Sequence, residues 1–224
     1  MTTTDLATSE DAGGLAIVDG QTSFNKTQVA TLRHMGVENA PEEDLRVFFH
    51  VCQRTGLDPF ARQIHMIGRN AKVRDSSGRE RWTTKYTIQT GIDGFRLIGR
   101  REANRRHETI SVPPHEWMHQ DGTWRPVWSK QWGTPLAAKA TVVREGQSFT
   151  AVAMFDEYAQ TKSGGLTSMW AQRPAGQLAK CAEALAWRMA FPQDLAGMYT
   201  DDEMSHADGH APGEQGEAPR SATP

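Results

Sequence analysis

The order in which helix-like and strand-like patterns follow one another constrains the fold of this chain more than any other feature of its sequence. Apolar residues recur at helical spacing in four segments: 26–35, 41–55, 95–102 and 177–190. Segments typical of strands come in neighbouring pairs, 63–67 with 82–90 and 136–144 with 148–155. Because neighbouring strands of this kind form antiparallel hairpins, the order predicts an α+β fold, in which helices pack on a small antiparallel sheet.

The two strands of the first pair differ in character. Residues 82–90 alternate clearly, which places Lys85 on one face and four residues on the other: Trp82, Thr84, Tyr86 and Ile88. The preceding strand is short, and residues 68–81 are predicted as a polar, basic connection. Residues 103–133 follow neither pattern, and residues 156–165 are predicted as a polar loop.

Small and polar residues dominate both ends of the 224-residue chain. They predict a disordered segment at 1–24 and an acidic, flexible tail at 205–224, which leaves 25–204 as one folded domain. No apolar run is long enough to span a bilayer, and the acidic start differs from a signal peptide. We therefore expect a cytoplasmic protein whose two cysteines, Cys52 and Cys181, are reduced and buried.

The formal net charge of −2 conceals an uneven distribution of charged residues. Residues 45–200 carry 22 bases and 13 acids, whereas 1–44 carry 2 bases and 8 acids and 201–224 carry 1 base and 6 acids. A basic body favours a polyanionic partner. The acidic ends either shield or compete for the basic surface, or only keep the chain in solution, and the sequence leaves both open.

The densest run of basic residues lies at 69–106, where 11 bases and 4 acids are interleaved with aromatic residues. Basic side chains bind phosphates and aromatic rings stack on unpaired bases, so this run indicates a nucleic-acid surface. The candidates are Arg69, Lys72, Arg74, Lys85, Arg96, Arg100 and Arg101. The alternative is a solvated basic face above a core that contains the aromatic residues.

A second basic set surrounds Trp170 and comprises Lys162, Arg173, Lys180 and Arg188. Lys180 and Arg188 are eight residues apart and share roughly one face of the last helix. Arg173 precedes the first turn of this helix, where backbone N–H groups attract phosphate. The alternative is that Trp170 lies in the core and the bases face solvent.

Patterns of catalytic residues are weak in this chain. His115, Glu116 and His119 match the H-E-x-x-H zinc motif, but prolines before it and Asp121-Gly122 after it leave too little room for the long helix that the motif needs. No P-loop is present, and no nucleophile–base pattern or carboxylate cluster is convincing. We therefore expect no catalytic residue, no metal and no cofactor. A zinc-dependent enzyme using these three residues stays as an alternative.

Two blocks of the sequence resemble the phage Bet/RecT group of single-strand annealing proteins, most closely its Bet branch. The first block is LRVFFHVCQRTGLDPF at 45–60, followed by Gln63-Ile64 and by 86–95. The second extends from Trp170 to Met204 and contains the run KCAEALAWRMAFP. The blocks keep the family's order and cover nearly all of the predicted domain.

The resemblance implies a protein that binds single-stranded DNA without ATP, holds it stretched and anneals it to a complement to give duplex DNA. It implies homo-oligomeric rings or helical filaments, a phage exonuclease as partner, and residence in the cytoplasm of a bacterial host, with no membrane and no covalent chemistry. The implied fold is a curved antiparallel sheet with a helix that lines a DNA groove. A passive single-strand binder without annealing activity is the main alternative.

The resemblance extends to a few individual positions. Arg188 matches a basic position that meets the DNA backbone, Trp170 matches an aromatic residue ahead of the last helix, and Lys180 lies in the same block. Residues 175–176 are Ala-Gly where the family's best-known member has bases, and Arg173 is expected to compensate. The acidic tail stands in place of that member's partner-binding domain, so contacts with host proteins through such a domain are not assumed.

Overall fold

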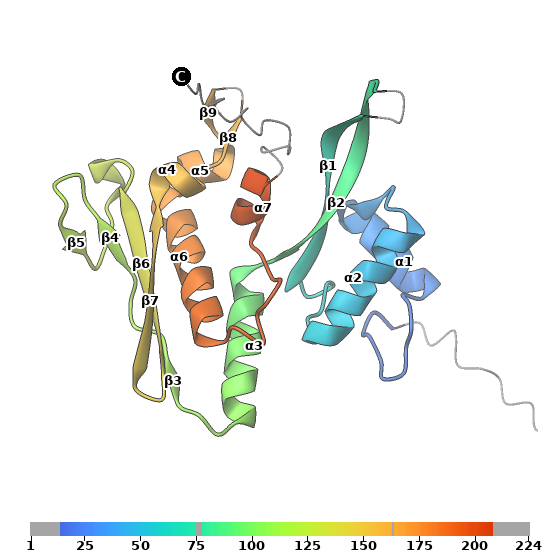
Figure 1. Cartoon of the computed structure of the whole chain (residues 1–224), viewed down its shortest axis with the longest axis horizontal. Coiled ribbons are helices and arrows are strands. Elements are labelled where there is room, and N and C mark those ends of the chain that lie inside the picture. Colours follow the sequence, from blue (N-terminus) through green and yellow to red (C-terminus); the bar gives the residue numbers. More distant parts are fainter. Residues whose placement is uncertain (1–13, 75–77, 163, 208–224) are drawn as a thin grey trace, which may run out of the picture.

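The computed structural model describes residues 14–74, 78–162 and 164–207, in which helices and antiparallel strands alternate along the chain (Figure 1). This arrangement confirms the predicted α+β class. The predicted tails at 1–24 and 205–224 fall mostly outside the described residues, and the domain limits of 25–204 stay a prediction. No helix in the described part is long and apolar enough to cross a membrane.

The first two predicted helices are confirmed. Helix α1 (Lys26–Leu32) runs on into a short π-helix, η1 (Arg33–Val37), and the helical winding ends around Gly36, whose φ is 106°. Helix α2 (Glu42–Thr55) carries three acidic residues in its first turn, where they face the positive end of the helix dipole. It ends at Gly56, which takes the left-handed conformation with φ of 61° that glycine adopts without strain.

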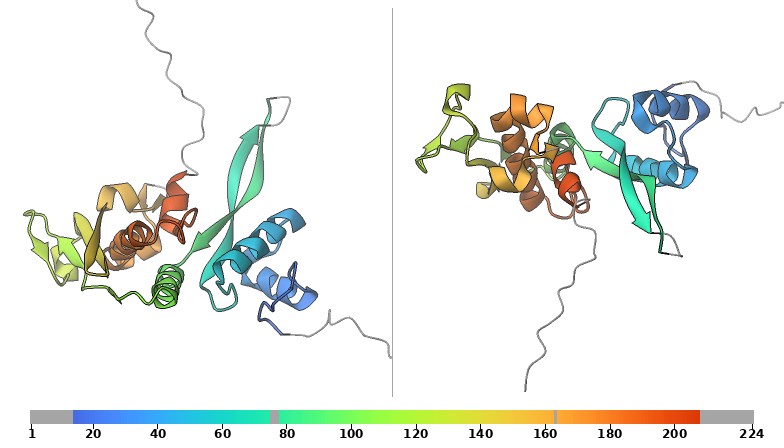
Figure 2. Two further views of the ribbon diagram at one scale, coloured as in Figure 1. Left: turned by 60° about the horizontal axis from the view of Figure 1, so that its bottom comes forward. Right: turned by 90° about the horizontal axis from the view of Figure 1, so that it is seen from above.

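The first strand pair forms a long hairpin that projects from the rest of the molecule (Figures 1 and 2). Strands β1 (Ile64–Arg74) and β2 (Glu80–Thr90) pair antiparallel over 11 residues each. The prediction of a connection over 68–81 is therefore wrong, because most of this polar segment continues the two strands. Side chains are buried near the base of the hairpin and exposed toward its tip, so the tip lacks the apolar alternation that marks a strand in sequence.

Two helices pack closely against each other. Helix α3 (Ile92–Arg105) follows β2, and helix α6 (Pro174–Ala190) begins with proline at its first position, three residues before the predicted start at 177. A Cβ atom on Gly99 of α3 would lie 2.3 Å from the Trp187 ring of α6. Glycine at this position therefore permits the close approach of the two helices.

A five-stranded antiparallel sheet packs on α6. Its central strand β6 (Ala137–Arg144) pairs along its length with β7 (Gln147–Met154), which confirms the second predicted hairpin. The other edge of β6 pairs with short strands formed by the segment whose sequence follows no pattern: β3 (Ile110–Ser111) and β4 (Glu116–Met118), the latter paired in turn with β5 (Trp124–Arg125). The segment continues through a short helix, η2 (Lys130–Trp132).

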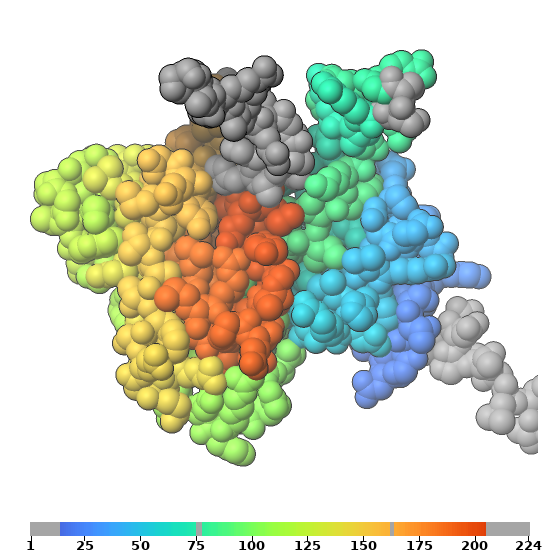
Figure 3. All heavy atoms as spheres, viewed as in Figure 1, coloured from blue at the N-terminus to red at the C-terminus, as the bar shows by residue number. Residues whose placement is uncertain are grey.

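Short elements connect the sheet to α6 and follow α6 at the end of the described chain. Between β7 and α6 lie α4 (Phe155–Tyr158), β8 (Thr161–Lys162), β9 (Gly165–Leu166) and α5 (Ser168–Gln172). The last element is the acidic helix α7 (Asp201–Ala207), which contacts β2 and α4. It lies between α6 and the hairpin (Figures 1 and 3).

Candidate nucleic-acid interface

The hairpin presents a high density of positive charge. Within its described residues, 64–74 and 78–90, six bases stand against one acid, Glu80: Arg69, Lys72, Arg74, Arg79, Arg81 and Lys85. The register places Arg69 directly opposite Lys85, and Lys72 opposite Trp82. Directly opposed residues share a face, so basic side chains lie on both faces of the hairpin.

Trp82 is the most exposed large aromatic residue of the hairpin, with 67% of its surface open to solvent. The Lys72 ammonium lies 5.4 Å from the centre of its ring and 3.3 Å from Glu80. Arg74 lies 3.6 Å from the same carboxylate. The alternation pattern correctly predicts that Trp82 and Tyr86 lie on the same face of β2. This face packs against the core at Tyr86 but is exposed to solvent at Trp82. The basic residues opposite Trp82 are the signal in the sequence that this tryptophan is not a core residue.

The basic residues of α6 differ in their surroundings. Arg188 pairs with Glu203 and also donates to the carbonyl of Met198 over 3.1 Å. Its guanidinium lies 5.5 Å from the ring centre of Tyr199, a half-exposed aromatic residue that no pattern in the sequence marks as a candidate. Lys180 is exposed and hydrogen-bonds to Gln177, and Arg173 is exposed at the N-cap of α6.

The acidic first turn of α7 links the hairpin to α6. Asp201 pairs with Arg69 of β1, and the Gln89 amide of β2 lies within 2.9 Å of the same carboxylate. Burial raises the pKa of Asp202, although hydrogen bonds and the Lys180 charge act in the opposite direction. Glu203 holds Arg188. We call this region, formed by Arg69, Lys85, Lys180 and Arg188 around the first turn of α7, the hairpin–α6 junction.

The predicted bases of α3 have other surroundings. Arg96 donates two hydrogen bonds, of 2.7 and 2.6 Å, to the buried carboxylate of Glu183. Arg101 donates to the carbonyl of Thr55 over 2.5 Å and so caps the C-terminal end of α2. Arg100 is exposed. The structure thus gives Arg96 and Arg101 contacts that stabilise the fold.

A hollow of about 460 Å³ opens between α3 and the segment before β4, with Glu183 and Trp187 in its lining. Burial raises the pKa of Glu183, but His115, Arg96 and Trp187 outweigh this effect through hydrogen bonding and lower it to about 2. The carboxylate is therefore ionised at neutral pH and neutralises Arg96. This arrangement accounts for the buried charge as part of the α3–α6 packing.

Trp170 lies in the core, with 1% of its surface exposed. Its Nε1 donates to Asp202 over 3.0 Å, and its ring packs edge-on against Phe155. The ring therefore has no free face on which a nucleic-acid base can stack. Trp170 is a core residue, as in the alternative interpretation of the sequence. The backbone of Lys162 belongs to β8, but its side chain lies outside the described residues.

The residues of the H-E-x-x-H pattern lie on and beside strand β4, where neighbouring residues point to opposite faces. Glu116 pairs with Lys139 over 2.6 Å, whereas His115 lies 3.2 Å from Glu183 and His119 lies 3.2 Å from Asp121. The three side chains thus have separate partners. Within the described ranges, no three His, Cys, Asp or Glu residues are grouped to hold a metal ion.

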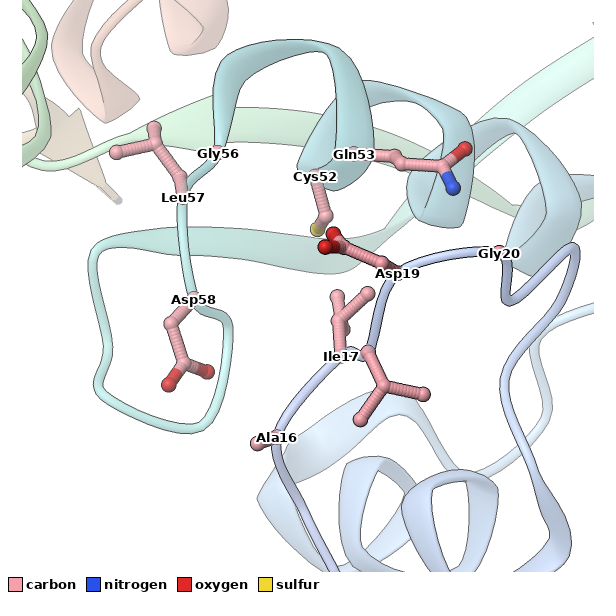
Figure 4. Close-up of a pocket in the computed structure, with 10 residues that line it drawn as sticks. Ala16, Ile17, Asp19, Gly20, Cys52, Gln53, Gly56, Leu57 and Asp58 are labelled. Carbon is pink, nitrogen blue, oxygen red and sulfur yellow. The ribbon is translucent and has the colours of Figure 1, made fainter. Parts of the chain in front are cut away.

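A second hollow, of about 300 Å³, lies where residues 16–20 cross the C-terminal end of α2 (Figure 4). Its lining contains the carboxylates of Asp19 and Asp58 and no basic residue. The negative charge makes it unsuitable for a phosphate. Burial raises the pKa of the Cys52 thiol in this lining to about 12, so the thiol is a poor nucleophile.

The fold and this surface define an α+β protein with a projecting basic hairpin and a second basic surface on α6, the α6 wall, formed by Arg173, Lys180 and Arg188. The family model of the RecT family matches residues 22–218. The chain therefore belongs to the RecT family, the phage-type single-strand annealing proteins of DNA recombination. Searches of curated proteins and of solved structures each found no match.

Proposed function

We propose that this RecT-family protein anneals complementary DNA strands without ATP, by holding one strand along the basic hairpin and the hairpin–α6 junction. The observation that carries the proposal is the hairpin itself, which projects from the core with six bases against one acid in its described residues. Packing in the core does not require such charge. Basic side chains of this kind do bind a phosphate backbone, independently of the base sequence.

The proposed surface has two kinds of contact. Arg69, Lys72, Arg74 and Lys85 of the hairpin, with Arg173, Lys180 and Arg188 of the α6 wall, neutralise phosphates and release counterions. Trp82 and Tyr199, both exposed beside a basic side chain, offer rings on which bases stack, whereas the buried Trp170 does not. Arg100 and Lys162 remain candidates on charge alone.

The annealing step needs no covalent chemistry in this proposal. The protein holds the strand extended with its bases open, and the complement supplies the free energy of pairing. Neighbouring subunits in a ring or filament extend the surface, so binding is cooperative. A phage exonuclease supplies the single strand.

Binding to a labelled oligo-dT at several salt concentrations tests where the strand lies. A double variant, Lys72→Ala with Arg74→Ala, should weaken binding and flatten the slope of log K against log salt by about 1.4, since each phosphate contact on a single strand contributes about 0.7. Lys26→Ala removes an exposed base from α1 and serves as the control. Equal behaviour of the two variants would contradict the placement on the hairpin.

A passive single-strand binder is the outcome that binding alone does not distinguish. It would show the same salt dependence but would leave the rate of pairing with a complement unchanged. The annealing rate at saturating protein therefore decides between the two functions.

A further inference from the structure

Helix α7 lies between the hairpin and α6, the two parts of the proposed DNA surface (Figures 1 and 3). Each of its first three residues is acidic and meets a different part of the protein. Asp201 pairs with Arg69 on the hairpin, and Glu203 pairs with Arg188 on α6. The two proposed walls of the surface are thus joined through carboxylates of one short helix.

The middle acid, Asp202, anchors this helix to the body of the protein. Its carboxylate accepts hydrogen bonds from Trp170 Nε1 at 3.0 Å, Gln160 Nε2 at 2.8 Å and Cys181 Sγ at 3.4 Å. The residue is buried, whereas Asp201 beside it has a half-exposed side chain. Asp202 and Asp201 are therefore adjacent in sequence but differ in environment, because Asp202 is held inside the protein and Asp201 is open to solvent.

The contacts of Glu203 use the donors that a phosphate would need. Both of its oxygens meet the Arg188 guanidinium, one of them over 3.1 Å, and the same carboxylate accepts from the Thr200 backbone over 2.9 Å. A carboxylate held by an arginine in this two-point manner has the geometry and charge with which arginine also binds phosphate. Arg188 therefore cannot bind a DNA phosphate in the same way until Glu203 moves.

We infer that α7 is an acidic latch on the hairpin–α6 junction, in which Asp201 and Glu203 occupy the positions of DNA phosphates and are displaced by the bound strand while Asp202 keeps α7 anchored. This inference rests on the proposed function. The latch lowers the affinity for single strands and lowers the salt dependence of binding, because each displaced carboxylate takes up a cation as the strand releases one.

The test compares two charge-removing variants with a control in binding to labelled oligo-dT. Asp201→Asn changes a half-exposed pair and should tighten binding up to about fivefold at low salt. Glu203→Gln removes a more buried two-point pair and should tighten binding about tenfold. Each should steepen the slope of log K against log salt by about 0.7. Glu43→Gln removes one exposed carboxylate from the first turn of α2 and should change neither quantity.

The outcomes separate the latch from the proposed function. Weaker or unchanged binding by Asp201→Asn, which has little bearing on folding, would overturn the latch and mean that α7 positions the arginines. An equal gain for Glu43→Gln would also overturn it, since the effect would then be one of net charge. Absence of binding by the wild-type chain and both variants at low salt would refute the proposed function itself. Thermal unfolding of Glu203→Gln shows whether that variant is folded.

Discussion

Replacement of Trp82 by alanine should weaken binding to single strands that carry bases and leave binding to an abasic strand almost unchanged. The indole is 67% exposed at the tip of the hairpin, beside the Lys72 ammonium. Stacking on an aromatic side chain contributes about 1–3 kcal/mol per base, and about 1.4 kcal/mol corresponds to a tenfold change in affinity. The expected loss is therefore about 5- to 150-fold.

The same exposure limits the effect of the substitution on folding. About one third of a side chain that has roughly 250 Å² of surface is buried, so at about 25 cal/mol per Å² the loss of folding free energy is at most about 2 kcal/mol. The Trp82→Ala protein should therefore stay folded, and a thermal melt checks this. Trp82→Phe keeps a ring on the same backbone and should retain most of the affinity.

Fluorescence anisotropy with labelled oligo-dT and an abasic oligonucleotide of the same length measures the effect. Lys72→Ala should weaken binding to both strands, because it removes a phosphate contact. An equal loss on both strands for Trp82→Ala would refute stacking on bases. A change in oligomer size instead of base-dependent affinity would mean that the indole contacts a neighbouring subunit.

Three further predictions concern the fold around the site. Gly99→Ala should lower the free energy of unfolding by about 1–3 kcal/mol, because its Cβ would lie 2.3 Å from the Trp187 indole of α6. Gly176→Ala, whose Cβ would have no atom within 4 Å, should raise it by about 0.5 kcal/mol. Denaturant unfolding compares the two variants, and equal stability would contradict the packing of α3 on α6. The pKa of Glu183 is lowered from 4.5 to about 2, so its carboxylate contributes fully to folding stability above pH 4.5 and loses this contribution as the pH falls toward 2. Glu183→Gln should therefore have a lower melting temperature than wild type at pH 7, and the difference should close over this pH range. A constant difference would argue against the ion pair. Burial raises the pKa of the thiols of Cys52 and Cys181, so a thiol reagent at pH 8 should label them only after unfolding, and rapid labelling of native protein would refute their burial.

Local patterns predicted α1, α2, α3, α6 and the second hairpin, because their signals lie within each segment, but they did not predict the short helices α4, α5 and α7. The left-handed Gly56 and the first-turn Pro174 mark helix ends by backbone conformation alone. The hairpin β1–β2 was predicted too short for a physical reason. Its outer half is held by cross-strand hydrogen bonds and not by burial, so no alternation of apolar residues marks it.

The sequence identified which residues carry positive charge but not which of them are engaged elsewhere in the fold. Arg96 meets a carboxylate 87 residues away, and Arg188 meets one 15 residues away across the end of α6. Such partners depend on tertiary packing, which composition and spacing do not contain. Trp170 illustrates the same limit for an aromatic residue, because its partners Phe155 and Asp202 lie 15 and 32 residues away in the chain.

A two-step annealing reaction tests the central claim most directly. The protein is loaded at saturation on one labelled strand, without ATP, and either the complement or a scrambled strand is then added. The account predicts pairing with the complement alone at a rate well above the protein-free rate, and a slower rate for the Lys72→Ala with Arg74→Ala variant at equal occupancy. Tight binding without acceleration by the wild-type protein would contradict the account and leave a passive single-strand binder.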